Sequence, residues 1–333
     1  MVKIKKLYLH FLEKEDKSKG EKIIYYFLLL LSFIYSMIMK ARNFLYDKEK
    51  IKSYRFSKKI ISIGGLSWAG AGKTGLVIYL HKRLSPEFKV ASITKGYAED
   101  ELLLLREKVG KVFDSKDRVR LIKKLESNFD VFLLDDGFQY RKIKRDLDVV
   151  IMSKEELEMR KVLIPASVFR EPLSSLKRAD ILVINYGEKE DILKVKEKIL
   201  TINPYLKIYY GNYRFKRFLD RNKREVKREY FQGKKIAVLT AIGYPKGFLE
   251  MVKKQKVNIE EKIIYPDHYR FSKATMSKIE ERLSKKNIRD VIITYKDFFH
   301  IDWGGCNLNY FILDVELEIE DGFLKVVREC LKS

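Results

Sequence analysis

The sequence is poor in the residues that build metal clusters and disulfide frameworks. Among its 333 residues there are four histidines and two cysteines, Cys306 and Cys330. The cysteines are far apart and in no metal-ligand spacing, which argues against a structural zinc site and against a disulfide framework. We therefore expect the protein to work in a reducing cytoplasm.

Negative charge is scarce relative to positive charge. Lysine and arginine number 69 against 46 aspartates and glutamates, which gives a formal net charge of +23. This excess favours anionic partners, such as nucleic acid, anionic lipid headgroups or a phosphorylated substrate. The chain is long enough for one large or two modest α/β domains with a sizeable core.

One segment, residues 23–39, lacks charge altogether and is bracketed by Lys22 and Lys40. As a helix it would reach roughly 25 Å, which is short of the roughly 30 Å hydrocarbon core of a bilayer. No small-residue cleavage site follows, so a signal peptide fits poorly, and basic residues on both sides do not choose an orientation. Leucines and aromatic residues would lie on all sides of this helix and not on one stripe. This favours a membrane-embedded anchor, monotopic or barely spanning, over a buried core helix.

A strand, a small-residue turn and a helix surround the segment SWAGAGKT, residues 67–74. The segment resembles the phosphate-binding pattern G-x-x-x-x-G-K-[ST], with serine in place of the first glycine. Gly70 and Gly72 allow backbone N–H groups to turn towards an anion, and the following helix offers its N-terminal amides. Lys73 is predicted to reach the β- and γ-phosphates, and Thr74 to present its hydroxyl to Mg²⁺. The predicted ATP-binding residues are Ser67, Trp68, Ala69, Gly70, Ala71, Gly72, Lys73 and Thr74. An ordinary βα turn with a surface lysine is the alternative.

Asp135 and Asp136 close a later apolar strand. An acidic residue at the end of a strand beside a P-loop strand is typical of the Walker B arrangement, in which a carboxylate holds Mg²⁺. Neighbouring side chains of an extended chain point to opposite faces, so at most one faces the metal and the other can orient a nucleophile. A solvated Asp-Asp turn is the alternative.

Continuous apolar strands alternate with helical stretches along the chain, which indicates a parallel sheet covered on both faces. We predict an α/β fold: a P-loop NTPase-like domain with an N-terminal membrane-associated helix, and a second, smaller α/β domain. The predicted boundaries are 1–50 for the membrane-associated segment, 51–212 for the P-loop core, 213–233 for a charged linker or exposed β-ribbon, and 234–333 for the smaller domain.

Five separated motifs occur in the order SWAGAGKT, LDDGFQYRKIKRDLDVV, LIPASVFREPLSSLKRADILV, YPDHYRF and TYKD. Together they resemble the tetraacyldisaccharide 4'-kinases, the lipid A 4'-kinases of Gram-negative bacteria, a family whose P-loop also lacks the first glycine. The resemblance spans residues 42–297. It implies transfer of the γ-phosphoryl group of ATP, with Mg²⁺, to the 4'-hydroxyl of a tetraacylated glucosamine disaccharide 1-phosphate.

The resemblance also implies roles for individual residues. His268 in PDHY matches a histidine that pairs with an aspartate near the nucleophile, and the nearest match to that aspartate is Asp100 in EDEL. Together they would accept the proton of the sugar hydroxyl, with Asp136 as the alternative base. Arg170 in FREP would contact phosphate of ATP or substrate, and Tyr97 in GYAE matches a substrate-site tyrosine. The expected catalytic residues are Asp100, His268, Asp136 and Lys73, and the expected metal ligands are Thr74, Asp135 and Asp136.

This chain departs from the family pattern at several positions. Ala69 replaces a glycine of the nucleotide loop, GYAE stands for G-Y-G-R, and Tyr295 replaces the glutamate of T-E-K-D. These departures indicate a divergent member of the family.

Two other functions are weighed against the kinase. A membrane-associated ATPase or GTPase is the first, but guanine recognition would want N-K-x-D where the sequence reads Asn185-Tyr186-Gly187-Glu188. A nucleic-acid-binding module is the second, with few aromatics among the basic residues of 213–233. The expected partners are therefore the lipid A disaccharide 1-phosphate precursor and an anionic membrane surface, without nucleic acid. The protein is expected to be a monomer at the cytoplasmic face of the bacterial inner membrane.

Overall fold

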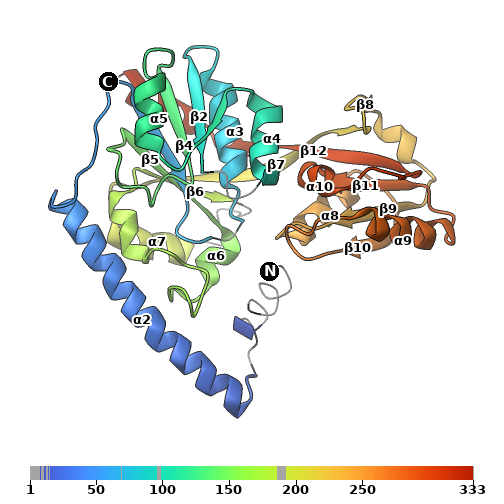
Figure 1. The fold of residues 1–333 in the computed structure, drawn as a ribbon, viewed down its shortest axis with the longest axis horizontal. Helices are drawn as coiled ribbons and strands as arrows, with labels where there is room; N and C mark the ends of the chain where they lie inside the picture. The colour runs from blue at the N-terminus through green and yellow to red at the C-terminus, as the bar shows by residue number, and fades with distance from the viewer. Residues whose placement is uncertain are drawn as a thin grey trace. The chain divides into compact units, whose positions relative to one another are not determined.

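The computed structural model describes residues 8, 11–12, 14, 16–68, 70–95, 99–185 and 193–332. The chain forms two compact units, a larger one of residues 11–212 and 317–333 and a smaller one that contains residues 213–316. Each unit has a sheet of mainly parallel strands with helices packed on it (Figure 1). The predicted α/β class is therefore confirmed.

The sheet of the larger unit has the strand order β7-β6-β5-β1-β4-β2-β3, and these neighbours pair in parallel. Every residue of β2, β4, β5 and β6 is buried, so both faces of the sheet are covered, as continuous apolar strands require. The strands are β1 Lys59–Gly64, β2 Val90–Thr94, β3 Val112–Asp114, β4 Val131–Asp135, β5 Leu147–Ser153, β6 Ile181–Asn185 and β7 Lys207–Leu219.

The helices of this unit present apolar residues to the sheet at helical spacing. On α5, for example, Val119 and Ile122 pack with Ile60 of β1 and Phe132 of β4. The helices are α2 Lys19–Asp47, α3 Lys73–Leu84, α4 Glu99–Val109, α5 Arg118–Leu125, α6 Lys154–Glu158, α7 Leu193–Ile202 and α11 Phe323–Lys332, with a 3₁₀ helix over Leu173–Arg178.

The sheet of the smaller unit has the order β10-β9-β11-β12, followed by the second part of β7, which also pairs with β8. Its strands are β8 Glu225–Val226, β9 Ile236–Thr240, β10 Ile259–Ile264, β11 Asp290–Thr294 and β12 Asn309–Ile319, and its helices are α8 Pro245–Lys254, α9 Lys273–Ser284 and α10 Tyr295–His300. A 3₁₀ helix covers Arg228–Phe231.

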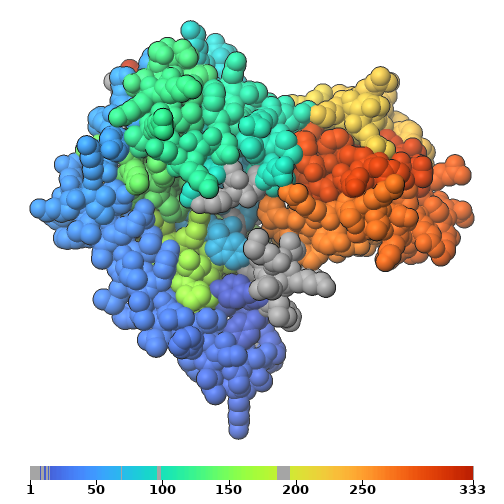
Figure 2. Space-filling model, viewed as in Figure 1, coloured from blue at the N-terminus to red at the C-terminus, as the bar shows by residue number. Residues whose placement is uncertain are grey.

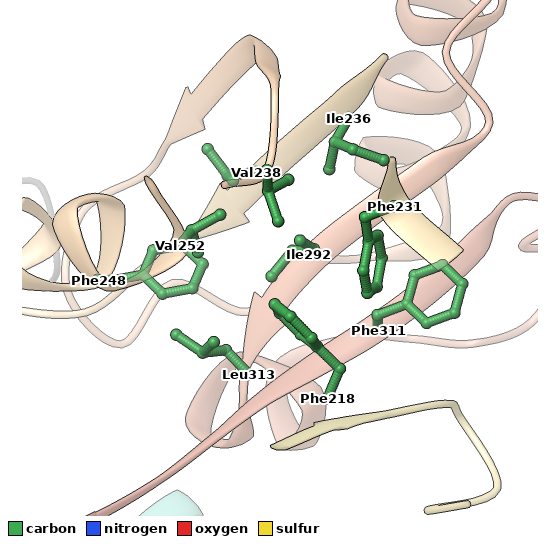
Figure 3. Close-up of a cluster of buried hydrophobic side chains, with 10 residues drawn as sticks. Phe218, Phe231, Ile236, Val238, Phe248, Val252, Ile292, Phe311 and Leu313 are labelled. Atoms are coloured by element: carbon green, nitrogen blue, oxygen red, sulfur yellow. The ribbon is translucent and has the colours of Figure 1, made fainter. Parts of the chain in front are cut away.

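An aromatic cluster forms the core of the smaller unit. Phe231 packs between Phe218 and Phe311, with ring centroids 4.5 and 5.0 Å away, and Val238 and Ile292 complete the cluster from two strands (Figure 3). Aromatic pairs in such tilted and edge-to-face geometry add to the stability that burial of their area provides. The basic stretch of residues 213–233 is therefore fixed to this unit by Phe218 and Phe231.

The boundaries of the units differ from the predicted ones at both ends of the smaller domain. Residues 213–233 do not form a separate linker, because Phe218 and Phe231 belong to the core of the smaller unit. The predicted alternative, a β-ribbon, is present in part, since the end of β7 pairs antiparallel with β8. Residues 317–333 return to the larger unit, where Phe323 packs on Tyr79 and Tyr209 with ring centroids 6.0 and 5.5 Å away. The sequence did not reveal these boundaries, because residues 213–233 are densely charged and residues 317–333 form only a short segment.

Helix α2 is longer than the uncharged run that predicted it. A capping box starts it, since Ser18 Oγ accepts from Glu21 N at 3.3 Å and Ser18 N donates to Glu21 Oε2 at 2.7 Å. By length and composition α2 could cross a membrane. It runs along one side of the larger unit (Figures 1 and 2). Its buried side chains are Ser32 and Met39, whereas Phe27 and Leu30 are more than half exposed, at 58% and 56%.

Candidate nucleotide site

The P-loop connects the central strand β1 to α3. Gly72 is the N-cap of α3 and has φ of 99°, a left-handed conformation that glycine adopts without strain. The helix starts at Lys73, so the first backbone amides of α3 lack intrahelical partners and suit an anion. The strand, turn and helix that the sequence predicts are therefore all present, with the Thr74 side chain buried at the start of the helix.

The position of the absent first glycine is occupied by a serine with a structural role. Ser67 is buried, forms an antiparallel bridge with Phe169, and its hydroxyl donates to the carboxylate of Glu156. Trp68 N donates to Val168 O at 3.2 Å, which continues this pairing. The backbone of Ser67 is not left-handed, so this position does not require a glycine. Ala69, the next predicted ATP-binding residue, lies outside the described residues.

Three other segments hold the carbonyl groups of the loop. Gly65 O accepts from Gln139 Nε2 at 2.8 Å, and Ala71 O accepts from Asn185 Nδ2 at 2.9 Å. Leu66 O accepts from Arg170 N at 2.7 Å and from the N–H of the next residue at 3.1 Å. In a trans peptide the N–H points opposite to the carbonyl, so tying the carbonyls to the protein leaves the amides directed away from those partners. These contacts therefore fix the carbonyl groups of the loop to three other segments of the larger unit.

Asp135 reaches the P-loop because of the register of the sheet. It ends β4, pairs with Ile63 of β1, and is buried. Burial, then the negative charges of Glu101 and Asp136, raise the pKa of Asp135 to about 6. Its backbone oxygen accepts from Arg118 Nη2 at 2.6 Å, so a buried cation also supports this strand end.

Asp136 has a different environment from its neighbour. Its φ of 48° takes the chain out of the extended conformation, so the two side chains do not follow the strict alternation of a strand. Both carboxylate oxygens accept from Arg170, at 2.8 Å from Nη1 and 2.7 Å from Nη2, and Nη2 also donates to Ser67 O at 2.9 Å. Burial acts to raise the pKa of Asp136, but the hydrogen bonds and charge of Arg170, with the charge of Lys73, hold it below its usual range.

The close approach of this turn to β1 depends on Gly64. A Cβ at Gly64 would lie 2.5 Å from Phe138 Cβ and 2.9 Å from Phe138 N. These distances are too short for real atoms, so any side chain here would push away the segment that carries the two aspartates.

The predicted proton acceptors lie in different units. Asp100 is buried in the first turn of α4 in the larger unit. His268 belongs to the loop after β10 in the smaller unit, has φ of 59°, and its N–H donates to Ala241 O at 2.9 Å. Its Nε2 lies 3.5 Å from Asp267 Oδ2. The pairing of Asp100 with His268 stays a prediction, and Tyr97 lies outside the described residues.

The TYKD motif supports the loop of His268 from within the smaller unit. Asp297 is fully buried, accepts from Ala241 N at 2.7 Å, and forms a capping box with Thr294 at the start of α10. Burial raises the pKa of Asp297, although its hydrogen bonds act in the opposite direction. Ala241 O in turn accepts from the N–H of His268. Ala241 therefore links the Asp297 carboxylate to the backbone of His268.

Sequence reasoning missed four residues that shape these sites: Arg118, Glu156, Asn185 and Asp297. Three of them had a readable signal. Asn185 is a polar residue that ends an apolar strand, and Asp297 and Glu156 follow a threonine and a serine at capping-box spacing. Arg118 had none, because an arginine near a helix start reads as solvated surface.

Comparisons with known proteins agree with this geometry. The family model described as tetraacyldisaccharide-1-P 4'-kinase matches residues 24–332. A tetraacyldisaccharide 4'-kinase of Aquifex aeolicus is 30% identical, with 90% of this chain and 97% of that protein covered. One from Halothermothrix orenii is 25% identical, with 96% and 95% covered. A crystal structure of LpxK from Aquifex aeolicus in complex with ATP superposes with a TM-score of 0.72 and 26% identity, over 92% of this chain and 99% of that one.

Restoring the usual glycine in the P-loop pattern is expected to destabilise the protein. In Ser67→Gly the buried Glu156 carboxylate loses a donor, and an unsatisfied buried group costs about 1–3 kcal/mol. We expect a lower thermal midpoint in Ser67→Gly and Ser67→Ala, measured by calorimetry, whereas Ser127→Gly at an exposed site should change it less. A thermal midpoint of Ser67→Gly equal to that of the wild type would contradict the structural role of this serine.

Proposed function

Because the chain belongs to the tetraacyldisaccharide 4'-kinase family, we propose that it phosphorylates the 4'-hydroxyl of a tetraacylated glucosamine disaccharide 1-phosphate with ATP. The family match over residues 24–332 carries the proposal. The P-loop supports ATP as the phosphoryl donor, as does the ATP in the related LpxK crystal structure. A guanine-specific GTPase is not favoured, since the Asn185 amide donates to Ala71 O of the P-loop.

Phosphoryl transfer asks the protein mainly for positioning and for neutralisation of charge. Lys73 and the amides at the start of α3 would bind the β- and γ-phosphates and stabilise charge on the transferring group. Arg170 would stand beside them, since its guanidinium bonds both Asp136 and the Ser67 carbonyl. Its backbone and side-chain contacts give the guanidinium a fixed orientation, which suits a group that must meet phosphate oxygens.

The side chains near the loop fit a magnesium site. The Thr74 hydroxyl and the Asp135 carboxylate are hard oxygen donors of the kind that Mg²⁺ prefers. Asp135 is the better candidate of the two aspartates, because both oxygens of Asp136 already accept from Arg170. The ion would neutralise charge on the phosphate oxygens. In the protein alone, burial and neighbouring acids disfavour the charged form of Asp135, and a bound cation would relieve that cost.

Asp100 and His268 would accept the proton of the sugar hydroxyl. Asp100 is buried in the larger unit, and the backbone of the smaller unit holds the loop of His268 through Ala241. We propose that both residues act on the same sugar hydroxyl during turnover.

The exposed face of α2 supports a location at a membrane surface. Ile23, Tyr26 and Phe33 expose 70%, 67% and 64% of their surface, which is unusual for apolar side chains in water. The less exposed face packs on the larger unit through Ser32 Oγ, which donates to Leu163 O at 2.6 Å. Further contacts come from Tyr35, Arg42 and Asn43, so the second half of the helix is tied to the unit, which suits a helix that lies in the interface. We therefore propose a monotopic helix at the cytoplasmic face of the inner membrane.

The activity can be tested with ATP, Mg²⁺ and the detergent-dispersed disaccharide 1-phosphate. Mass analysis should detect one added phosphate, and Lys73→Ala should reduce turnover by about 10²-fold or more, because charge on the transferring group loses its partner. Lys82→Ala on the exposed side of α3 is the matched control and should retain activity. ATP hydrolysis that does not depend on the disaccharide would instead indicate an ATPase.

The proton acceptors can be tested by a pair of variants and their combination. A well-placed base contributes on the order of 10²–10⁴-fold, so Asp100→Asn or His268→Ala should lower kcat with little change in ATP affinity. If the two act as one unit, the double variant should be scarcely slower than the slower single variant. Glu99→Gln, an exposed neighbour of Asp100, is the control. Unchanged turnover in Asp100→Asn would exclude Asp100 and favour Asp136 as the base.

The membrane surface can be tested by placing charge on the exposed face of α2. Leu30→Glu combined with Ile34→Glu should release the protein from vesicles of phosphatidylethanolamine and phosphatidylglycerol, because a carboxylate in the apolar layer is strongly disfavoured. Activity on detergent-dispersed substrate should persist. The matched control adds the same two charges at exposed apolar positions elsewhere, Tyr205→Glu and Ile264→Glu, and should still float with vesicles. Equal flotation of both double variants would rule out α2 as the membrane contact.

A further inference from the structure

The polar side chains of α2 lie largely on its packed face, whereas its exposed face is mostly apolar, which is the reverse of an ordinary surface helix. Its less exposed positions recur every three or four residues, some of them in adjacent pairs, and mark the face towards the rest of the larger unit: Glu21, Tyr25, Leu28, Leu29, Ser32, Tyr35, Ser36, Met39, Arg42, Asn43 and Tyr46. Several of these are polar, whereas the outward positions are mostly apolar. In a helix that only anchors a soluble domain, polar groups on the packed face need a reason, because their partners must also be desolvated. The reason lies in what they contact.

Tyr35 contacts a residue of the nucleotide site. Its hydroxyl donates to the backbone oxygen of Arg170 at 3.2 Å. The N–H of the same arginine donates to Leu66 O at 2.7 Å, and its guanidinium bonds both oxygens of Asp136. Arg170 is therefore fixed from three directions: by α2, by the P-loop and by the acidic turn after β4.

Arg42 reaches the other side of the same loop. Its Nη2 donates to Gln139 O at 2.7 Å, and Gln139 Nε2 donates to Gly65 O at 2.8 Å. Tyr35 and Arg42 are two turns apart on α2. Each bonds one residue that in turn bonds a P-loop carbonyl: Tyr35 through Arg170 to Leu66 O, and Arg42 through Gln139 to Gly65 O. The segment that follows Asp136 is held on one side by α2 and on the other by the P-loop.

We propose that Tyr35 and Arg42 are positioning residues for phosphoryl transfer, which act through Arg170 and Gln139 on the P-loop and the acidic turn. The inference rests on the proposed function, because that function assigns Arg170 and the P-loop to the transferred phosphoryl group. The helix that faces the bilayer is then also part of the framework that orients the catalytic groups. A displacement of about 1 Å in such a framework is enough to lower a rate substantially.

The first test removes a single hydroxyl. Tyr35→Phe keeps the ring and its packing but loses the hydrogen bond to Arg170 O. We expect kcat/KM for ATP to fall about three- to tenfold, the range of one neutral hydrogen bond, while KM for the disaccharide and flotation with phosphatidylethanolamine and phosphatidylglycerol vesicles stay unchanged. Tyr26→Phe, whose ring is 67% exposed on the same helix, is the matched control and should behave as the wild type.

The second test removes a charge. Arg42→Ala should lower kcat/KM for ATP in the same way, and Lys40→Ala, at an exposed position on α2, should not. Thermal midpoints are measured for all variants. If Arg42→Ala fails to fold, Tyr35→Phe decides the question, because that change preserves the packed ring.

A double-variant cycle separates positioning from a general loss of stability. If Tyr35 acts through Arg170, Tyr35→Phe should cost less than about twofold in an Arg170→Ala background, measured as the affinity for a fluorescent ATP analogue with Mg²⁺. An equal loss in both backgrounds would overturn the proposal, as would wild-type kinetics and nucleotide affinity in Tyr35→Phe.

Nucleotide binding needs no lipid acceptor, so its measurement separates a failure of the positioning role from a failure of the proposed function. If the wild type does not phosphorylate the disaccharide while Tyr35→Phe still weakens nucleotide binding, the proposed function fails and the positioning role stands. If the wild type phosphorylates the disaccharide and Tyr35→Phe matches it in both measurements, the positioning role fails and the proposed function stands.

Discussion

The bidentate pair between Arg170 and Asp136 is the interaction on which the nucleotide site depends. It joins the turn after β4 to the segment that pairs with the P-loop, and Arg170 also bonds the Ser67 carbonyl. Both side chains are only partly buried, so the pair itself contributes little to stability, whereas its bidentate geometry fixes the orientation of the guanidinium. The pair is therefore better understood as a device for orientation than as a source of stability.

The same pair gives two adjacent aspartates different chemistry. Asp136 is held in its charged form by the guanidinium, whereas burial and neighbouring acids raise the pKa of Asp135 to about 6. Environments that separate two neighbouring carboxylates commonly separate their roles. Here one carboxylate is paired with a protein cation, and the other is the one that we propose as a ligand of Mg²⁺.

Much of the fold was readable because its strands are buried on both faces. Continuous apolar runs predicted the parallel sheet, and the order of strand, glycine turn and GKT predicted the P-loop between β1 and α3. The five motifs identified the family, which the match over residues 24–332 confirms. The boundaries of the units were not readable, because the apolar residues around Phe218 and Phe231 are short groups in a strongly basic stretch without a continuous apolar run.

The site itself was only half visible in the sequence. Motif residues could be named, but their supports come from far along the chain, and spacing does not reveal them. Ser67 is held by Glu156, and the P-loop carbonyls by Gln139 and Asn185. Such contacts depend on which strands become neighbours, so they follow from topology and not from local pattern. The serine in the P-loop looked like a defect until its partner was known.

The return of the C-terminus to the larger unit has a consequence for how the protein is made. Phe323 packs on Tyr79 and Tyr209, so the larger unit joins residues that are separated by the whole of the smaller unit. During synthesis the P-loop strand leaves the ribosome before the smaller unit, and α11 leaves after it. The P-loop strand can find its neighbours early, but α11 cannot take its place until the smaller unit has been made. Until then the surface that α11 covers stays open, and long-range closure of this kind is slow. A chain that lacks α11 would therefore expose the surface around Tyr79 and Tyr209 of the larger unit, although the smaller unit immediately precedes α11 in the sequence.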